Sequence, residues 1–432
     1  MWTNWPRSHH CVPSRHLRPG SRAEVAAAVA GAREVRVAGS GHSFTAAPLT
    51  ADTLLELDRL DRVLDVDRGA GLVRVEAGIT LAALNRALDA HGLALPNLGD
   101  IAAQTLGGAL ATGTHGTGAR HPILSAQVEA MELVLAGGEE RTLTRADGDL
   151  LRAARVGVGT LGAVVAVTLR CVPAFALHGV DRPEPLDDVL ADLQDRAGRH
   201  EHFEFFTFPH SPLALTRTNT PTAAPPRPPS PAREWLGEIA VDNAALDVLC
   251  RLGRRFPAAI PALNRFASRV ATRREHVDRS YRVFASTRLV RFTEMEYALP
   301  RERAAEAVRA VKAILERHPV SFPVELRFAA ADDALLSPAH GRDSVYVAVH
   351  AYAGMPWEAP FREVEALLAG WGGRPHWGKR TFLDAGDLAP RYPGWGAWQA
   401  ARAELDPGGA FTNDWARKTF GPVQRNVRPS PR

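Results

Sequence analysis

The residues best suited to binding a phosphate group form one glycine-rich turn near the N-terminus. The stretch Val35–Phe44 reads Val-Arg-Val-Ala-Gly-Ser-Gly-His-Ser-Phe, an alternating run that leads into Gly39-Ser-Gly41. Glycine permits a positive φ and has no Cβ, so a ligand can approach the backbone closely. Successive N–H groups in such a turn form a concavity that binds anions such as a pyrophosphate. The pattern therefore predicts a cofactor loop at the end of a short strand.

His42 directly follows this turn and lies at the rim of the predicted loop. Three roles fit a histidine there: packing within the loop, acid or base catalysis, or a covalent bond to a flavin. The last is chemically reasonable because an imidazole can add to the 8α-methyl group of an oxidised isoalloxazine ring. His115, within Thr-His-Gly, is a second candidate that its own loop backbone could hold instead. The residue types alone leave both histidines open.

Two further stretches are rich in glycine. Asp100–Gly118 also contains several threonines and suits a cofactor wall, because small residues let a ring system approach and hydroxyls supply hydrogen bonds. A tight turn with only a packing role is the alternative. Gly157–Gly162 matches G-x-G-x-x-G, but a helical pattern precedes it and a strand follows it. A Rossmann dinucleotide site requires the reverse order, so we do not expect one.

A second group of polar residues lies in the C-terminal half. Glu325 and Arg327 are separated by one residue on an apolar predicted strand, so both side chains point to the same face. They are either exposed to solvent or paired within a site. His350 ends a later apolar strand and has a structural or a catalytic role. Lys379 closes a compact His-Trp-Gly-Lys group. None of these four residues identifies a reaction by itself.

Short alternating helices and strands position these residues in the first part of the chain. Capping residues and apolar periodicity predict helices at Ser21–Arg33, Thr80–His91 and Asp149–Ala154. Apolar alternation predicts a hairpin over Val63–Glu76, and strands at Ala130–Leu135, Glu140–Leu143 and Ala163–Val172.

The composition changes after Pro173, where a second unit begins. Strands are predicted at His202–Phe208, Val324–Phe328 and Val345–His350, and helices at Asn243–Thr272, Glu302–Arg317 and Pro360–Ala369. Pro221–Pro231 is interpreted as an exposed loop. The arginines of Asn243–Thr272 are interpreted as a solvated helix face and not as a nucleic-acid surface. This order favours an antiparallel sheet covered by helices.

The composition is that of a globular protein: 432 residues, of which 45% are apolar and 23% charged. Cys11, Cys171 and Cys250 are odd in number and widely spaced, which argues against a disulfide framework or a metal site and favours a cytoplasmic protein. We expect no membrane-spanning helix and no signal peptide. The net charge of +4 identifies no partner, and the basic tail after Arg417 is interpreted as a solvated end.

Several motifs, taken in order from Trp5 to Gly421, resemble the aldonolactone oxidase family of vanillyl-alcohol-oxidase-type flavoproteins. This family includes gulonolactone, galactonolactone and arabinonolactone oxidases or dehydrogenases, and alditol oxidase. The motifs are Gly39–Phe44, Ala111–Gly116, Gly159–Val164, Glu325–Arg327, His376–Lys379, Leu405–Pro407 and Phe411–Asn413.

The resemblance implies an α+β fold in three segments. Residues 1–175 would form a two-lobed FAD-binding domain of the PCMH type. Residues 176–372 would form an α+β cap domain with an antiparallel sheet that covers the isoalloxazine, and residues 373–432 would return to the FAD domain.

The resemblance also implies the site residues. FAD would contact Val37, Ala38, Gly39, Ser40, Gly41, His42, Ser43, Thr105, Gly108, Ala109, Thr112, Gly113, Thr114, His115, Gly116 and Val164. His42 would bond the flavin 8α carbon. The catalytic residues on the substrate side would be Glu325, Arg327, Lys379 and His350.

The implied activity is FAD-dependent oxidation of a sugar 1,4-lactone of the D-arabinono or L-gulono type, by hydride transfer to flavin N5. Arg327 would stabilise developing negative charge. Glu325 would orient a substrate hydroxyl, and Lys379 or His350 would help to accept its proton. Oxygen or another acceptor would reoxidise the flavin. The alternatives are an alditol oxidase on the same fold and a flavin-binding paralogue without turnover; no nucleic-acid partner is expected.

Overall fold

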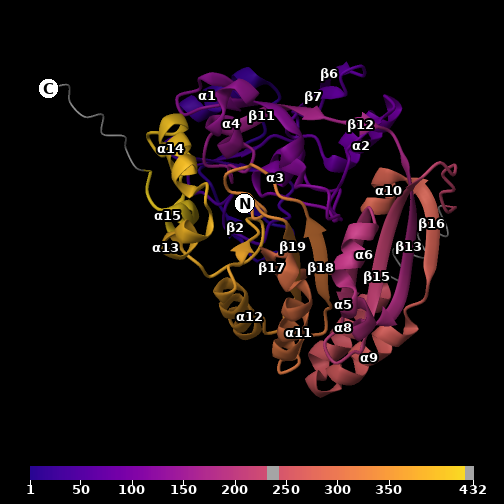
Figure 1. Cartoon of the computed structure of the whole chain (residues 1–432). Coiled ribbons are helices and arrows are strands. Elements are labelled where there is room, and N and C mark those ends of the chain that lie inside the picture. Colours follow the sequence, from indigo (N-terminus) through magenta and orange to yellow (C-terminus); the bar gives the residue numbers. More distant parts are fainter. Residues whose placement is uncertain (231–242, 424–432) are drawn as a thin grey trace.

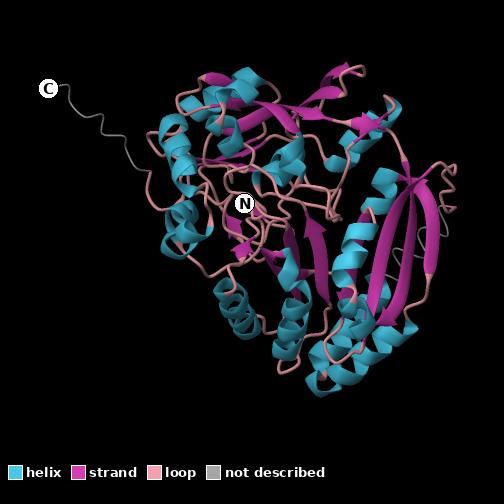
Figure 2. Cartoon of the chain, in the orientation of Figure 1, coloured by secondary structure: helices cyan, strands magenta, loops and turns pink. Residues whose placement is uncertain are grey.

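The computed structural model describes residues 1–230 and 243–423 of the chain. An N-terminal part with small sheets lies beside a larger part that is built on one long sheet (Figure 1). Helices cover the outer side of the large sheet, and loops fill much of the region between the two parts (Figure 2). The last helices, at the yellow end of the chain, pack beside the N-terminal part.

The predicted phosphate-loop strand belongs to a small parallel sheet of order β3-β5-β4. These strands are Arg15–Leu17, Thr53–Glu56 and Val35–Ala38. Helix α1 (Arg22–Ala30) precedes β4 and packs Val25 and Val29 into the same core as Val35. Ser21 caps this helix by accepting a hydrogen bond from the Glu24 N–H group, as predicted. Because β4 ends at Ala38, the Gly39 turn begins at the carboxyl edge of the sheet.

A five-stranded antiparallel sheet of order β10-β9-β11-β7-β6 forms the second lobe. Its strands are Glu140–Thr144, Val128–Val134, Ala163–Arg170, Leu72–Glu76 and Val63–Asp67. Helices α2 (Leu81–Ala90), α3 (Leu106–Ala111) and α4 (Asp149–Ala154) share its apolar core. Short elements complete the lobe: β8 (Leu93–Ala94), β12 (Val172–Pro173), and the 3₁₀ turns η1 (Leu124–Gln127) and η2 (Arg145–Asp147).

The second part is an eight-stranded antiparallel sheet of order β16-β13-β15-β14-β18-β19-β17-β20. Its strands are Arg274–Arg279, Ala176–Pro185, Leu213–Thr222, His202–Thr207, Val324–Ala329, Ser344–Tyr352, Phe292–Pro300 and Arg374–Pro375. Helices α5 (Leu186–Ala191), α6 (Leu193–Arg199), α11 (Ala304–Leu315) and α12 (Glu358–Gly370) bury apolar residues against it. Its other helical elements are α8 (Leu246–Arg255), η4 (Pro257–Ala259), α9 (Ile260–Val270), α10 (Ser280–Phe284) and η5 (Arg301–Arg303).

The C-terminal segment returns to the N-terminal part and contacts both of its lobes. It contains α13 (Ala385–Leu388), η6 (Ala389–Arg391), α14 (Trp395–Leu405) and α15 (Asp414–Phe420). The Val35 N–H group donates to the Ala410 carbonyl at 2.8 Å, and the buried guanidinium of Arg36 donates to the carbonyls of Gly159 and Phe411. The N-terminus of the chain forms a small antiparallel pair of strands, β1 (Trp2–Thr3) and β2 (His10–Cys11).

The structure confirms most predicted elements and corrects one. The hairpin over Val63–Glu76 and the helix Asp149–Ala154 are present as predicted. The single helix predicted over Asn243–Thr272 is wrong, because Pro257 divides it into α8 and α9. Proline has no N–H group and disfavours helical geometry in the residue before it. Residues 223–230 form a mainly exposed loop, whereas Pro231 and the tail beyond residue 423 lie outside the described residues.

The sequence also raised the questions of disulfide bonds and of membrane-spanning helices. Cys11, Cys171 and Cys250 are all free thiols. Within residues 1–230 and 243–423, no helix combines the length and the apolar character that crossing a bilayer requires.

Candidate active site

A long cavity lies between the two sheets of the N-terminal part. It contains about 1170 Å³ of space free of protein atoms. Every residue from Val37 to Ser43 lines it on one side, and Met131, Leu133 and Val164 from the antiparallel sheet line it on the other. The predicted phosphate loop and Val164 therefore border one continuous space.

The first two glycine-rich stretches meet in the wall of this cavity. A Cβ on Gly39 would lie 2.2 Å from Oγ1 of Thr105, so any larger residue would force the Thr105 side chain or the loop to shift. Gly41 has a φ of +72°, which favours glycine for a different reason. Gly108 and Thr112 line the cavity together with Thr105. Residues that are far apart in the sequence thus form one surface.

The rest of the second stretch divides between three places. Thr114 and His115 line a neighbouring cavity and not the long one. Ala109 is fully buried in the apolar core. Gly113 and Gly116 line neither space; a Cβ on Gly116 would lie 2.4 Å from the Leu98 carbonyl oxygen, so this glycine is needed for packing.

The sequence analysis missed the third glycine stretch as a cavity wall. Gly157, Val158, Gly159, Leu161 and Gly162 all line the long cavity. Gly159 has a φ of +66°, and its carbonyl accepts a hydrogen bond from Arg36 at 2.7 Å. The stretch is not a Rossmann turn, as expected. Its closely spaced glycines could still have indicated a backbone that borders a ligand-binding cavity.

His42 lies at the rim of the long cavity, stacked on Trp5 with ring centroids 5.4 Å apart. Its side chain makes no hydrogen bond to any residue that the structure describes. Burial, assisted by the positive charge of Lys379, lowers the pKa of His42 to about 4. The imidazole is therefore neutral at pH 7, with an unprotonated ring nitrogen.

The neighbouring cavity has polar walls and contains about 1000 Å³ of space free of protein atoms. All four predicted catalytic residues line it: Glu325, Arg327, His350 and Lys379. Gln104 lines both this cavity and the long one, so the two spaces adjoin at that residue.

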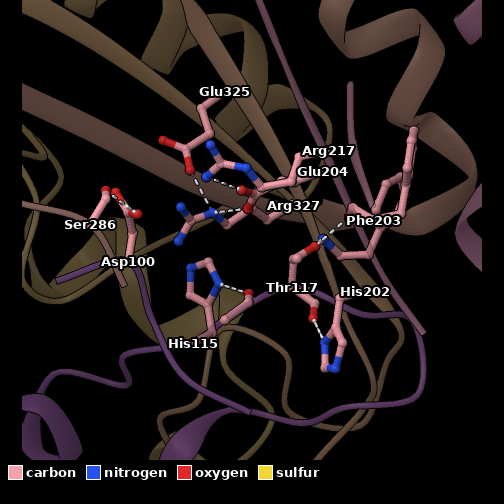
Figure 3. A network of polar contacts seen from close by, with 12 residues as sticks. Asp100, His115, Thr117, His202, Phe203, Glu204, Arg217, Ser286, Glu325 and Arg327 are labelled. Carbon is pink, nitrogen blue, oxygen red and sulfur yellow. Dashed lines mark hydrogen bonds and ion pairs between the residues drawn. The ribbon is translucent and has the colours of Figure 1, made fainter. Parts of the chain in front are cut away.

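Glu325 and Arg327 are a buried pair and not an exposed one. Their side chains are 12% and 11% exposed, and Arg327 Nε lies 2.5 Å from Glu325 Oε1. Arg327 Nε also lies 2.9 Å from Oε2 of Glu204, on the neighbouring strand β14 (Figure 3). Two carboxylates thus hold one guanidinium. Sequence reasoning missed Glu204, which the aromatic run of β14 gave little reason to select.

Asp100 links a loop of the first part to the loop between α10 and β17 in the second part. It accepts hydrogen bonds from Ser286 Oγ at 2.8 Å (Figure 3) and from the guanidinium of Arg288. Burial raises the pKa of Asp100, but Arg288, Arg327 and Arg217 outweigh it and leave the pKa well below its ordinary value. The carboxylate is therefore charged and fixes one wall of the polar cavity.

Lys379 and His350 share a carboxylate that the sequence analysis did not single out. Glu294, on β17, places Oε2 2.5 Å from Lys379 Nζ and Oε1 3.5 Å from His350 Nε2. His350 Nε2 also lies 3.9 Å from Glu325 Oε2. The available signal was the spacing of Glu294 and Glu296, which places two acids on one face of a buried strand.

Hydrogen-bond positions and nearby carboxylates determine the charge of His350. Nδ1 of His350 lies 3.2 Å from the Pro323 carbonyl, which can only accept, so this nitrogen carries a proton. Nε2 then lies beside the carboxylates of Glu294 and Glu325. Both groups only accept hydrogen bonds, so Nε2 must also carry a proton to interact favourably with them. Burial lowers the pKa of His350, but Glu294 and Glu325 outweigh it and raise the pKa. His350 is therefore a cation in the resting site.

His115, also lining the polar cavity (Figure 3), is held in the same way on one side. Its Nδ1 atom donates to the Gly116 carbonyl at 2.9 Å, and its Nε2 atom lies 3.2 Å from Glu296 Oε1. His115 thus places one ring nitrogen on a backbone carbonyl and the other beside a buried carboxylate. The ring stacks on Tyr346 at 3.6 Å between centroids, so its orientation is fixed.

His376 completes a buried group with His115 and Glu296, whose ligand atoms all lie within 4.8 Å of one another. Two histidines and a carboxylate are a set that metals bind. Nδ1 of His376, however, accepts a hydrogen bond from the Gly378 N–H group at 3.0 Å. The proton of the neutral ring is therefore on Nε2, which then has no lone pair for a metal. The group is better described as a buried polar cluster that backbone hydrogen bonds orient.

Two family models match the chain. The model described as D-arabinono-1,4-lactone oxidase matches residues 167–419, and the model described as FAD binding domain matches residues 13–144. The boundary between them lies close to the change from the first part of the structure to the second.

Several characterised proteins are similar over nearly their whole length. L-gulono-1,4-lactone dehydrogenase of Mycobacterium tuberculosis is 45% identical over 98% of this chain and 99% of its own. L-gulonolactone oxidase of Bos taurus is 35% identical over 96% of this chain and 97% of its own. Alditol oxidase of a Streptomyces species is 32% identical over 96% of this chain and 98% of its own. A solved structure of a solvent-stable cholesterol oxidase superposes with a TM-score of 0.80 at 21% identity, over 96% of both chains, which shows a shared fold.

Proposed function

Because this chain belongs to the D-arabinono-1,4-lactone oxidase family, we propose that it is an FAD-linked oxidoreductase acting on a CH–OH group of a sugar 1,4-lactone. The relatives' names point to L-gulono- and D-arabinono-1,4-lactone as the substrates to test first. One observation carries the proposal: a long cavity in the part matched by the FAD model adjoins a polar cavity lined by buried ion pairs.

The residues that line the long cavity suit FAD chemically. A Cβ on Gly39 would collide with the Thr105 hydroxyl, and the glycine turn offers backbone N–H groups to a pyrophosphate. Val37–Ser43 would hold the pyrophosphate, and Thr105, Gly108, Thr112 and Val164 would lie along the ring system. When bound, FAD supplies the acceptor for the hydride that leaves the alcohol carbon.

We assign to His42 the covalent attachment of the flavin. Three features support this role: its place at the cavity rim, its neutral ring at pH 7, and the absence of a competing side-chain hydrogen bond within the described chain. A neutral imidazole has a nucleophilic nitrogen, which addition to a flavin methyl group requires. Stacking on Trp5 holds the ring in one orientation.

On the substrate side, the buried ion pairs suit a neutral molecule with many hydroxyl groups. Arg327, held by two carboxylates, provides a fixed positive charge for the negative charge that develops as hydride leaves. His350 was expected to help accept the substrate proton. Its ring is already a cation in this account, so it cannot accept another proton. Lys379 is likewise held as a cation by Glu294.

Glu325 remains as the proton acceptor. Burial raises the pKa of this carboxyl, which makes the carboxylate a stronger base than an exposed glutamate. Its location between Arg327 and His350 lets it receive a hydroxyl proton next to two cations. Glu325 both orients the hydroxyl and takes its proton in this account.

Oxygen or another electron acceptor would reoxidise the enzyme, and we place the enzyme in the cytoplasm on the basis of its three free thiols. An alditol oxidase is the second candidate, favoured by the 32% identical Streptomyces relative. A paralogue without turnover is disfavoured by the complete set of buried polar residues.

The test is steady-state oxidation of L-gulono-1,4-lactone, D-arabinono-1,4-lactone and open-chain alditols, each with oxygen and with a dye acceptor. Turnover of a lactone with kcat/KM well above that of every alditol is expected. Preference for an alditol would replace the proposal by its second candidate. Flavin-loaded protein that turns over neither class would leave only flavin binding.

A further inference from the structure

The helix pair α8 and α9 shows one unusual face to solvent. In α8, Val248, Arg251, Leu252 and Arg255 follow the spacing i, i+3, i+4, i+7 and are all exposed. In α9, Ala262, Arg265, Phe266 and Arg269 repeat the same spacing and are also exposed. Together with Phe256 and Val270, these residues form what we call the α8–α9 face.

Large exposed apolar side chains are more numerous on this face than anywhere else in the described chain. Eight large apolar residues are exposed among the described residues, and five lie between Leu246 and Val270. Phe256 and Phe266 are 54% and 57% exposed. The inner sides of the helices are buried normally, through Cys250 and Ile260. The outer face is therefore not needed for the core.

The charge of the face is strongly one-sided. Residues Leu246–Val270 contain five arginines and one acidic residue, Asp247, which gives a net charge of 5 − 1 = +4, as large as that of the whole chain. Asp247 pairs with Arg251 at 2.7 Å. Within the described chain, four of the five arginines have no acidic partner: Arg254, which donates to the Ala353 carbonyl at 3.1 Å, and Arg255, Arg265 and Arg269.

We propose that the α8–α9 face docks the protein peripherally on a membrane surface that carries anionic lipids. The arginines would bind lipid phosphates, and Phe256, Phe266 and their aliphatic neighbours would enter the boundary with the acyl chains. A nucleic acid offers phosphates but no apolar layer for Val248, Leu252 and Val270, so a lipid surface matches both halves of the pattern. Figure 1 shows α8 and α9 at the outer end of the large sheet, far from the C-terminal helices, where a flat surface can reach them.

The proposal is tested by sedimentation of the flavin-loaded full chain with vesicles of phosphatidylcholine alone or with phosphatidylglycerol added. We expect binding only to the anionic vesicles, and weaker binding as salt is raised. The triple variant Arg255→Glu, Arg265→Glu, Arg269→Glu should lower the vesicle partition coefficient by about tenfold or more. The double variant Phe256→Ser, Phe266→Ser should lower it without changing the charge.

A matched control reverses three exposed arginines elsewhere, Arg68, Arg86 and Arg309, and should bind the vesicles as the unmodified protein does, apart from a small effect of net charge. Turnover with a soluble acceptor reports folding of each variant. Failure of the unmodified protein to sediment with anionic vesicles overturns the proposal, and so does equal loss in the control. Self-association in solution that the Phe256 and Phe266 changes abolish, without any vesicle binding, would assign the face to a second copy instead.

Discussion

Glu294 divides its two carboxylate oxygens between Lys379 and His350. Oε2 lies 2.5 Å from Lys379 Nζ, and Oε1 lies 3.5 Å from His350 Nε2. Burial raises the pKa of Glu294, but Lys379 and His350 outweigh it and keep the pKa below its ordinary value. One buried anion therefore holds two buried cations beside the polar cavity, and the charge state of the site depends on it.

Replacing Glu294 by Gln keeps the shape and removes this charge. Leaving buried cations unpaired typically costs about 3–5 kcal/mol, so we expect a lower unfolding temperature and loss of the proton from His350 at lower pH. Thermal unfolding and the pH profile of flavin reduction measure the two effects. Glu302→Gln, an exposed change on the same part of the chain, is the control. Unchanged stability and pH profile would show that Glu294 does not set the charges of the site.

The free energy of unfolding should fall as the pH rises above neutrality, because His350 then loses its charge. The folded-state pKa of His350 is raised, so the stabilisation from its ion pairs is complete below its unfolded pKa, about 6.5, and is lost as the pH rises through the folded value. His350→Gln should remove this loss, so its unfolding temperature should change less on the alkaline side. His10→Gln, at an exposed position, should keep the original slope. A His350→Gln profile parallel to that of the unmodified protein would contradict the assigned charge.

Arg327→Ala should slow flavin reduction and leave FAD bound. Arg327 lies in the polar cavity and not in the long one. Removing a preorganised charge that stabilises a transition state typically costs about 10²- to 10³-fold in rate. Rapid-mixing kinetics without oxygen give the rate, and the visible spectrum gives the flavin content. Arg309→Ala, exposed on α11, is the control. A full reduction rate in Arg327→Ala would remove this residue from the mechanism.

Gly39→Ala should abolish or strongly reduce flavin binding. The added Cβ would lie 2.2 Å from Thr105 Oγ1, so the Thr105 side chain must rotate or the loop must shift, and either change alters the cavity wall. Gly396→Ala adds the same methyl group on α14 with no heavy atom within 4 Å, and should keep its flavin. The flavin-to-protein absorbance ratio of the purified variants is the measurement. Normal flavin content in Gly39→Ala would show that the close contact is not required.

His42→Ala should release its flavin on acid unfolding. In the unmodified protein we expect the flavin to stay with the peptide that contains His42. Because the other residues that line the cavity are unchanged in the variant, FAD should still bind before unfolding. Flavin that remains on the His42→Ala polypeptide, or that is released from the unmodified protein, would withdraw the covalent role of His42.

The sequence predicted the elements that local patterns determine. Ser21 and Thr80 begin helices because their side chains cap them, and Glu325 and Arg327 share a face because strand geometry requires it. It did not predict that Glu204, Glu294 and Glu296 complete the site. These acids come from strands β14 and β17, whose positions beside β18 and β19 depend on sheet order, and no local pattern specifies that order.

The orientations of His350 and His115 could not be predicted from the sequence either. They follow from the backbone carbonyls of Pro323 and Gly116, which direct one ring nitrogen of each histidine and leave the other facing carboxylates. Likewise, Gly157–Gly162 was set aside on motif order, although its backbone borders the same cavity as the first glycine loop.

The most direct test is to mix the purified, flavin-containing protein with L-gulono-1,4-lactone in the absence of oxygen and follow the visible absorbance of the flavin. The account predicts rapid bleaching, slowed by about 10²- to 10⁴-fold in Glu325→Gln, since this variant lacks the proton acceptor. D-arabinono-1,4-lactone should bleach the flavin by the same route. An oxidised flavin that neither lactone bleaches, in protein that retains its full flavin content, would contradict the central claim.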